Sequence, residues 1–201
     1  MNVVIIDYGA GNARSVYFAL QRQGVNAIFS KKAEEISRAD AIIFPGVGHA
    51  VKAKENLINE GLWELIPTLK QPFLGVCLGM QLMGSCTEEG NTEGLNIVPN
   101  AVRSFKPTHG KIPHMGWNQV SLNSSGDALF NGISHLDYHY FVHSYYMESG
   151  KATTASCDYG LRFTAAIRQH NFFGVQFHPE KSGLVGEQLL ANFLAISNTW
   201  K

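Results

Sequence analysis

The chain has 201 residues, enough for one domain with a substantial core but short of two. Its 16 basic residues balance its 16 acidic residues, which argues against a nucleic-acid-binding surface or a polybasic membrane patch. No apolar run approaches the ~20 residues of a membrane span, and the first run ends at Asp7, which indicates a strand rather than a signal peptide. We therefore expect a single cytoplasmic domain over residues 1–201, with neither nucleic acid nor membrane as a partner.

The first half of the chain alternates short apolar runs with helical patterns. Continuous apolar strands that alternate with helices predict a parallel sheet covered on both faces. The spacing of apolar residues predicts helices over residues 13–24, 50–61 and 78–86. The predicted strands of this half are Val3–Asp7, Val25–Phe29, Asp40–Phe44 and Pro72–Cys77.

The second half is richer in strands separated by turn signals, and it closes with a helical pattern over residues 182–200. We expect these strands to form antiparallel extensions of the sheet as well as its remaining strands. The predicted fold class is thus α/β, one domain with a mostly parallel central sheet flanked by helices. The strand-like segments are residues 100–105, 117–122, 138–148, 151–157, 163–169 and 172–177.

Three cysteines, an odd number and widely spaced, argue against a disulfide framework. The histidines are scattered apart from a loose group at His135, His139 and His143. His139 and His143 would share one face of an extended strand, where polar residues near a site are the simpler explanation than metal ligands. We therefore expect no metal and no other cofactor.

Cys77 lies between two glycines at the end of a predicted strand, in the pattern Gly75-x-Cys77-x-Gly79. This is the cysteine counterpart of the nucleophile elbow, a sharp strand-to-helix turn that exposes a nucleophile. Glycines tolerate the close backbone approach, and the amide of Leu78 could face a developing oxyanion. The alternative is a small buried apolar residue, the usual state of a free cysteine. Cys86 and Cys157 lack the glycines, and for them we prefer that alternative.

The sequence GVQFHPEKS provides a general base and a group to orient it. Pro179 favours an extended His178, which places His178 and Glu180 on the same side of the chain. Glu180 could hold the imidazole while His178 exchanges a proton with Cys77. An ordinary surface turn is the alternative, but the tripeptide follows an apolar strand and so lies at a strand end. Whether this end meets that of Cys77 cannot be read from the sequence.

GVCLGMQL together with the distant GVQFHPEKS resembles the class I glutamine amidotransferases, whose glutaminase domains use a Cys-His-Glu triad. The resemblance continues through DYGAGN, IFPGVGHA, KIPHMGWN and YFVHSYY, and it covers nearly the whole chain. PGVGH and PHMGWN are most similar to the glutaminase subunits that supply ammonia to a cyclase in histidine biosynthesis. The resemblance implies a flavodoxin-like fold, hydrolysis of L-glutamine through a thioester, and Cys77, His178 and Glu180 as the triad.

The resemblance also implies an oxyanion hole and a glutamine-binding pocket. The oxyanion donors would be the amides of Leu78 and Val47, the second available after a peptide flip that flanking glycines permit. We hypothesise that this flip couples glutaminase activity to the state of the partner. The substrate-binding residues implied are Gly46, Gly48, Gln81, His143, Ser144 and Tyr145.

The partner implied is a TIM-barrel cyclase subunit that receives ammonia and binds the phosphorylated substrate. We expect PHMGWN to form a loop at that interface and Asn12, in a strand-to-helix turn, to face the same partner. Simple packing is the alternative for Trp117, and a solvated side chain is the alternative for Lys181. The expected interface residues are Asn12, Trp117, Tyr140 and Lys181.

Two positions depart from the family pattern, Ala50 in place of an aromatic residue and Gly84 in the helix after the elbow, and we expect both to soften the local packing. Three other functions stay open. The chain could be another class I glutaminase, such as that of pyridoxal phosphate synthesis, or a catalytically silent regulator of a synthase. A cysteine peptidase is compatible with the elbow alone, although the H-P-E spacing fits it poorly.

Overall fold

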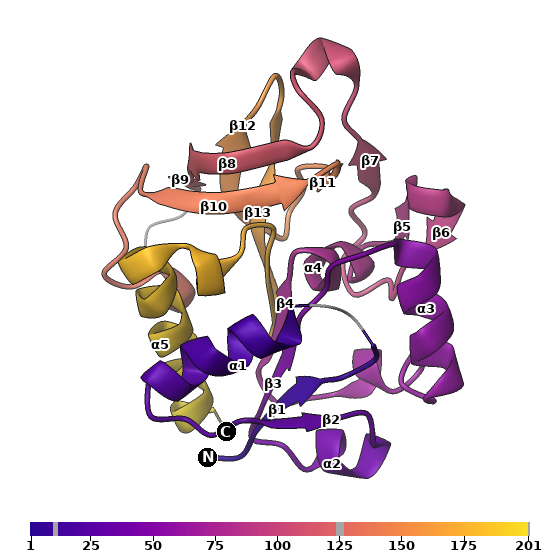
Figure 1. Cartoon of the computed structure of the whole chain (residues 1–201), viewed down its shortest axis with the longest axis vertical. Helices are drawn as coiled ribbons and strands as arrows, with labels where there is room; N and C mark the ends of the chain where they lie inside the picture. Colours follow the sequence, from indigo (N-terminus) through magenta and orange to yellow (C-terminus); the bar gives the residue numbers. More distant parts are fainter. Residues whose placement is uncertain (10–11, 124–126, 201) are drawn as a thin grey trace.

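The computed structural model of the chain describes residues 1–9, 12–123 and 127–200 (Figure 1). Its largest sheet contains a parallel part with the strand order β2-β1-β3-β4-β14. This is the 2-1-3-4-5 order of a flavodoxin-like sheet, so the predicted fold class is confirmed. The parallel strands are β1 (Val3–Ile6), β2 (Ile28–Ser30), β3 (Ala41–Phe44), β4 (Phe73–Val76) and β14 (Phe172–Val175).

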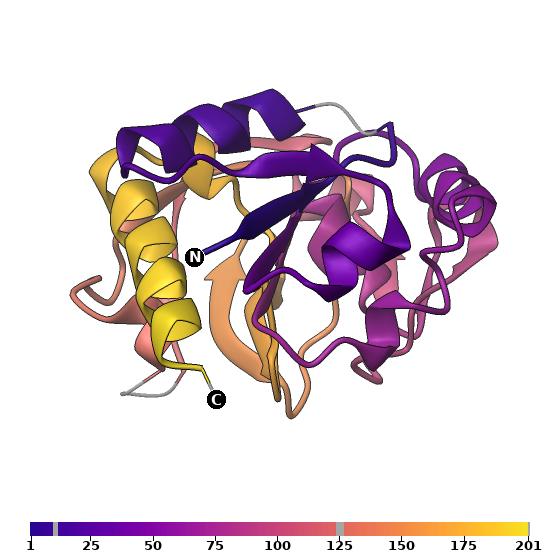
Figure 2. The same ribbon diagram turned by 90° about the horizontal axis from the view of Figure 1, so that it is seen from below.

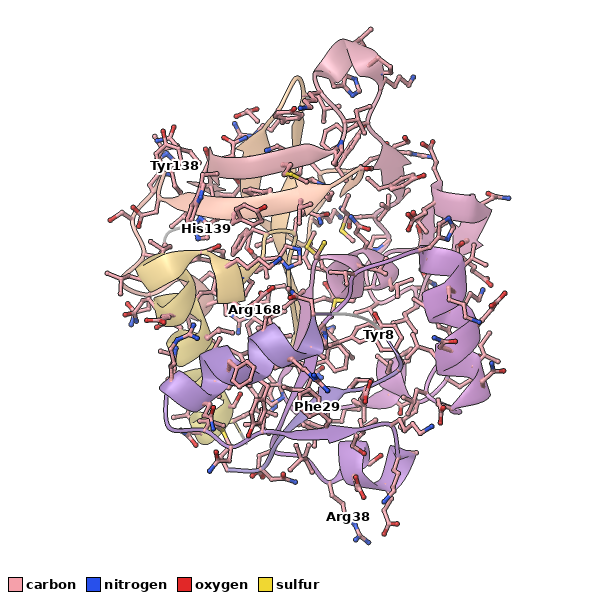
Figure 3. The ribbon with its side chains drawn as sticks, in the orientation of Figure 1. Tyr8, Phe29, Arg38, Tyr138, His139 and Arg168 are labelled. Atoms are coloured by element: carbon pink, nitrogen blue, oxygen red, sulfur yellow. The ribbon has the colours of Figure 1, made fainter. Side chains whose placement is uncertain are left out.

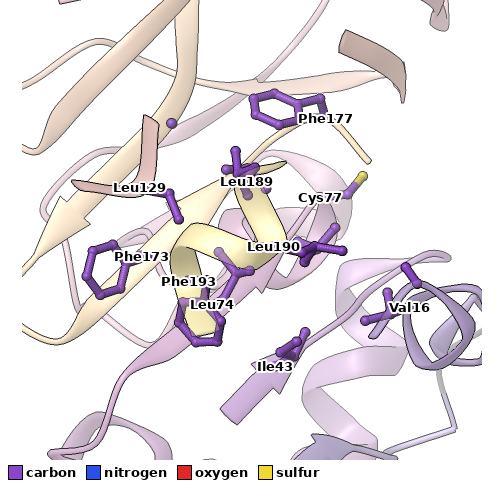
Figure 4. Packing of buried hydrophobic residues seen from close by; sticks show 14 of the residues in the cluster. Val16, Ile43, Leu74, Cys77, Leu129, Phe173, Phe177, Leu189, Leu190 and Phe193 are labelled. Atoms are coloured by element: carbon purple, nitrogen blue, oxygen red, sulfur yellow. The ribbon is translucent and has the colours of Figure 1, made fainter. Parts of the chain in front are cut away.

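Helices cover both faces of this parallel part, as Figure 2 shows from below. Successive side chains of a strand point to opposite faces, so Val3 and Ile5 join one core cluster while Val4 and Ile6 join the other. Helices α1 and α5 pack into the first cluster (Figure 4), and α2, α3 and α4 pack into the second. Each large apolar side chain buried in this way contributes ~1.5–3 kcal/mol. The helices are α1 (Ala13–Arg22), α2 (Ala33–Ser37), α3 (Ala50–Asn59), α4 (Leu78–Leu82) and α5 (Gly183–Thr199).

Beyond β14 the sheet continues mainly with antiparallel pairs, in the order β13, β11, β7, β5 and β6. Strands β12 and β9 extend it from β13, and β5 pairs with β7 in parallel. The predicted antiparallel addition is therefore confirmed. Its strands are β5 (Cys86–Thr87), β6 (Thr92–Glu93), β7 (Val102–Ser104), β9 (Ser121–Leu122), β11 (Tyr145–Met147), β12 (Thr153–Asp158) and β13 (Arg162–Gln169).

A separate two-stranded sheet lies at the top of Figure 1, built from β8 (His114–Gln119) and β10 (Tyr138–His143). The two strands run antiparallel, with Trp117 opposite Tyr140. In β10 the side chains of His139, Phe141 and His143 are buried, so the predicted shared face is present.

Four predicted elements are wrong in detail. The second strand begins at Ile28 rather than at Val25, because the amide of Val25 donates to the carbonyl of Leu20 and closes α1. PHMGWN is strand β8 and not a loop, since β10 supplies a hydrogen-bonding partner about twenty residues away in sequence. The predicted strands over 117–122 and 138–148 are each divided between the two sheets, the second at Ser144.

None of the helices within the described residues combines the length and the apolar character that spanning a membrane requires. The same part of the chain contains no group of three or more His, Cys, Asp or Glu side chains placed to hold a metal ion.

Candidate active site

Cys77 forms a sharp turn between β4 and α4, with φ 54° and ψ −110°. This positive φ is unusual for a residue with a side chain and indicates local strain. The flanking glycines permit the turn, because a Cβ atom on Gly79 would lie 2.0 Å from the carbonyl oxygen of Phe44 and one on Gly75 2.9 Å from the backbone of Gly79. Figure 4 shows the sulfur of Cys77 pointing away from the packed core side chains. The structure therefore has the geometry expected of a nucleophile elbow.

The end of β14 lies beside the end of β4, since Val175 pairs with Val76 and the amide of Cys77 donates to the carbonyl of Val175 at 2.8 Å. His178 and Glu180 follow directly on β14. The two strand ends, which the sequence could not connect, are thus neighbours, and Cys77, His178 and Glu180 meet at one edge of the sheet.

The imidazole of His178 is buried and donates from Nδ1 to Oε1 of Glu180 at 2.7 Å. Its Nε2 atom is also buried and has no hydrogen-bond partner within the described residues. Burial by itself lowers the pKa of His178, but interactions with Cys77 and Glu180 outweigh it and raise that pKa well above its ordinary value. The arrangement favours a protonated imidazole beside Cys77, and acyl transfer to sulfur requires a proton donor in that place.

Asn12 contacts this pair, although we expected it at the partner interface. It is the N-cap residue of α1, with φ 71°, and its side-chain amide donates to Oε1 of Glu180. The same oxygen of Glu180 therefore accepts from both Asn12 and His178, and Nδ2 of Asn12 lies 3.3 Å from Nδ1 of His178. The local sequence of DYGAGN gave no signal for it, because the two residues are 168 positions apart.

A cavity of about 300 Å³ opens beside Cys77. Of the predicted substrate and oxyanion residues, all except Gly46 line it. Three further residues that the sequence did not mark, Glu89, Pro113 and Val142, complete the wall. The predicted residues in the wall are Val47, Gly48, Cys77, Leu78, Gln81, His143, Ser144 and Tyr145.

Gly46 lies behind the wall, and its carbonyl accepts the amide of Leu78 at 3.3 Å. In this conformation the amide of Leu78 is therefore already paired, and its part in an oxyanion hole stays a prediction. The segment is held firmly, since the buried hydroxyl of Tyr8 donates to the carbonyl of Pro45 at 3.0 Å. Burial and the nearby Cys77 raise the pKa of Tyr8 and keep it a neutral donor.

Glu89 lies at the mouth of the cavity and anchors the start of α3, because its Oε2 atom accepts the amide of Ala50 at 2.8 Å. A carboxylate here offers a partner for the ammonium group of an amino-acid ligand. The segment around it, TEEGN, carries no motif, so only the folded chain identifies it.

Gln81 is buried in the wall of the cavity and is not a solvated glutamine on the surface of its helix. Its Nε2 atom donates to the carbonyl of Tyr145 at 2.8 Å and to Oε1 of Gln176 at 2.9 Å. Its side-chain oxygen Oε1 has no hydrogen-bond partner among the described residues and is available to a ligand.

A chain of hydrogen bonds runs from this wall to strand β8. Nδ1 of His143 donates to the carbonyl of Tyr145 at 2.7 Å, which leaves Nε2 of His143 to accept from Nδ1 of His114 at 2.9 Å. Nε2 of His114 in turn accepts from the amide of Asn118 at 3.2 Å. Burial lowers the pKa of His114 to about 4 and that of His143 to about 3, so both rings are neutral.

Trp117, Tyr140 and Lys181 come from three segments and form one exposed cluster. The rings of Trp117 and Tyr140 lie 6.0 Å apart, and the ammonium of Lys181 lies 5.8 Å from the centre of the Tyr140 ring. The Trp117 side chain is 55% exposed, so simple core packing does not account for it.

The two departures from the family pattern do not loosen the structure as expected. Ala50 is fully buried, and a Cβ atom on Gly84 would lie 2.6 Å from the carbonyl oxygen of Asn100. Gly84 is therefore a point of close backbone contact. Cys157 is buried as predicted, whereas Cys86 is exposed, so the prediction of a buried residue is wrong for Cys86; neither is in a disulfide.

The fold and this site together define a thiol-dependent amide hydrolase with the nucleophile on an α/β elbow. The family model for glutamine amidotransferase class-I matches residues 4–196, and the chain belongs to this family.

Within the family, the chain is similar to subunits of one synthase. It is 46% identical to the imidazole glycerol phosphate synthase subunit HisH of Bacteroides fragilis over 98% of this chain and 100% of that one. It is 49% identical to HisH of Salmonella typhimurium over 96% of this chain and 99% of that one.

Two solved structures show the same fold at low sequence identity. A glutamine amidotransferase aligns with a TM-score of 0.77 at 17% identity, over 99% of this chain and 100% of that one. The glutaminase domain of CTPS from Trypanosoma brucei aligns with a TM-score of 0.68 at 16% identity, over 100% of this chain and 96% of that one.

Proposed function

We propose that the chain is the glutaminase subunit of an imidazole glycerol phosphate synthase and that it hydrolyses L-glutamine to glutamate and ammonia. The observation that carries this proposal is the meeting of Cys77 with the buried His178–Glu180 pair at the ends of β4 and β14, beside a cavity of about 300 Å³. Similarity to HisH subunits over nearly the full chain supports the particular synthase.

The mechanism follows from the roles of the three side chains. The Cys77 thiolate attacks the side-chain amide carbon of glutamine, and the C–N bond breaks as His178 gives its Nε2 proton to the departing ammonia. His178 then removes a proton from water, which attacks the γ-glutamyl thioester and releases glutamate and the thiolate. Glu180 holds the ring so that Nε2 faces the sulfur throughout.

The oxyanion hole is closed in the structure, and we propose that a flip of the Gly46–Val47 peptide opens it. The flip removes the Gly46 carbonyl from the amide of Leu78 and brings the amide of Val47 to the same place, which gives two donors. Gly46→Ala cannot test this cleanly, since its Cβ would lie 2.7 Å from the amide nitrogen of Gly79. Gly48 has open space and φ +114°, so Gly48→Ala is the better variant. We expect it to reduce stimulation by the partner, and intact stimulation would contradict the flip.

The partner proposed is a TIM-barrel cyclase subunit that receives ammonia away from water. The exposed cluster of Trp117, Tyr140 and Lys181 supports a docking surface of aromatic and basic character. The whole chain, residues 1–201, would be the one catalytic domain. Free thiols at all three cysteines support a cytoplasmic location.

The experiment measures ammonia release from glutamine by the chain alone, with the cyclase, and with the cyclase and its nucleotide ligand. We expect strong stimulation by the loaded cyclase, lost by about 10⁴-fold or more in Cys77→Ala. The matched control is Cys86→Ser, which changes an exposed thiol outside the cavity and should keep full activity.

Two other outcomes separate the alternatives. Activity that depends on Cys77 but is not stimulated by the cyclase would support a glutaminase and contradict its assignment to histidine biosynthesis. A glutaminase such as that of pyridoxal phosphate synthesis would then be the alternative. An absence of activity under every condition would favour a silent regulator.

A further inference from the structure

Gln176 is a buried residue beside the nucleophile that neither the motifs nor the mechanism has used. It follows directly on β14, two positions before His178, and its side chain is 0% exposed. Its Nε2 atom lies 3.6 Å from Sγ of Cys77, and its Oε1 atom accepts from Gln81 at 2.9 Å. Both polar ends of the side chain are therefore engaged inside the site.

The orientation of the Gln176 amide follows from a backbone atom. The carbonyl of Tyr145 can only accept, so the Gln81 atom 2.8 Å from it must be the NH₂ group. The second hydrogen of that NH₂ group points to Gln176, which must present its oxygen in return. The NH₂ group of Gln176 is then the end that faces the sulfur of Cys77.

We propose that Gln176 stabilises the thiolate of Cys77 by donating an N–H to its sulfur, and that Gln81 positions Gln176 for this contact. A thiolate accepts a hydrogen bond far better than a thiol does, so a fixed donor in a buried place favours the charged form of the nucleophile. The inference rests on the proposed function only in taking Cys77 as the nucleophile. Gln176 would then be a second group, besides His178, that favours the thiolate form of Cys77.

A purely structural role for Gln176 would be to hold Gln81 in the cavity wall. Two variants distinguish the roles. Gln176→Met keeps the approximate volume and removes both hydrogen bonds. Gln176→Glu keeps the oxygen that accepts from Gln81 but replaces the donor at the sulfur with a second oxygen, whose charge opposes a thiolate.

The test measures the rate at which iodoacetamide alkylates Cys77 in the full-length chain from pH 5 to pH 10, in a Cys86→Ser background. We expect about tenfold slower alkylation at pH 7 for Gln176→Met, and slower still for Gln176→Glu, because a hydrogen bond to a charged group is lost. The pH of half-maximal rate should rise in Gln176→Met. Gln71→Met is the matched control, since it removes a glutamine hydrogen bond to the carbonyl of Ile36 and should leave alkylation unchanged.

The proposal is overturned if Gln176→Met reacts like the parent at every pH. It is equally overturned if Gln176→Glu matches the parent while Gln176→Met is slow, since that result assigns Gln176 the role of holding Gln81. Circular dichroism establishes that each variant is folded, and Gln176→Met alone decides the matter if Gln176→Glu does not fold. Alkylation needs no glutamine turnover, so this result is independent of whether the glutaminase function is correct. In the complex with the cyclase, Gln176→Glu should lower kcat for glutamine and leave KM within about twofold.

Discussion

The parallel sheet and the two-stranded sheet β8–β10 bury different kinds of side chain. Strands β1, β3, β4 and β14 are buried along their whole length and, apart from glycines, entirely apolar. The β8–β10 sheet instead buries three histidines, of which His114 and His143 are linked by hydrogen bonds, and exposes Trp117 and Met115. Figure 3 shows Tyr138 and His139 at the end of β10 that lies farthest from β11. The first sheet gains stability from apolar area, whereas the second buries polar rings and leaves an aromatic surface for a partner.

The largest expected effect is that of acid on the stability of the β8–β10 sheet, because of its buried histidines. Burial lowers the pKa of His139 to about 4 and that of His143 to about 3, while both titrate near 6.5 in the unfolded chain. Below pH 6.5 both histidines are protonated in the unfolded chain but stay neutral in the folded chain. The free energy of unfolding therefore falls as the pH drops towards 4. At about 1.4 kcal/mol per pKa unit, lowering the pH from 6.5 to 4 should cost roughly 6 kcal/mol for the two rings together. Urea unfolding at each pH provides the measurement.

Protonated carboxylates also weaken the fold in acid, so a pair of variants isolates the histidines. His139→Leu should flatten the pH profile, because it removes one buried ring whose Nε2 has no partner among the described residues. His170→Asn changes an exposed histidine in a turn with φ 54° and should leave the slope as it was. Equal slopes in the two variants would contradict the prediction.

The parallel sheet should be most sensitive to volume. In Gly79→Ala the new Cβ would lie 2.0 Å from the carbonyl oxygen of Phe44, a backbone atom with little room to move. We expect a loss of about 3 kcal/mol in urea unfolding at pH 7. Gly24→Ala is the control, since it has the strain of φ +77° but no atom within 4 Å, and should cost only about 1 kcal/mol. Similar losses in both variants would show that close packing at Gly79 is not decisive.

A smaller effect is expected where the triad joins the two regions. Because the pKa of His178 is raised in the fold, its pairing stabilises the protein fully below pH 6.5 and less as the pH rises through the folded value. Glu180→Gln removes the charge that His178 faces at 2.7 Å, and we expect a loss of about 2 kcal/mol at pH 6 that shrinks at higher pH. Urea unfolding at pH 6 and pH 9 provides the measurement. A loss that grows with pH would contradict the sign.

The smallest effect on stability is expected at the exposed face of the β8–β10 sheet. Trp117→Ala should change the free energy of unfolding by less than about 0.5 kcal/mol, because the side chain is 55% exposed. The same variant should bind the cyclase at least about tenfold more weakly in a calorimetric titration, as expected of an aromatic anchor. Binding at parental affinity would remove Trp117 from the proposed interface.

Local patterns predicted the parallel sheet well because each buried strand is a continuous apolar run and the helices α1, α3, α4 and α5 follow a helical pattern. The short helix α2 was not predicted. The elbow at Cys77 and the pair His178–Glu180 were also predictable, since both depend on residues close together in the chain. What failed depended on distant partners. Strand β8 was expected as a loop because the proline before it and the glycine within it are visible locally and its partner β10 is not.

The same limit applies within the site. Asn12 reaches Glu180 across 168 positions, and Glu89 enters the cavity from a segment without a motif. The pairing of the Leu78 amide with the Gly46 carbonyl is a matter of backbone conformation, which residue types alone do not specify. Tertiary arrangement supplied these contacts, and no local signal could have replaced it.

The carbonyl oxygen of Tyr145 receives both Gln81 and His143, and it belongs to the main chain. Substitution at position 145 therefore leaves this acceptor in place, whatever side chain is introduced. A mutation at position 145 therefore does not remove the acceptor that orients the Gln81 amide and the His143 imidazole. Only a chemical change of the backbone, such as an ester in place of the amide that follows Tyr145, would weaken it, and that replacement would disturb the thiol side and the β8 side of the network together.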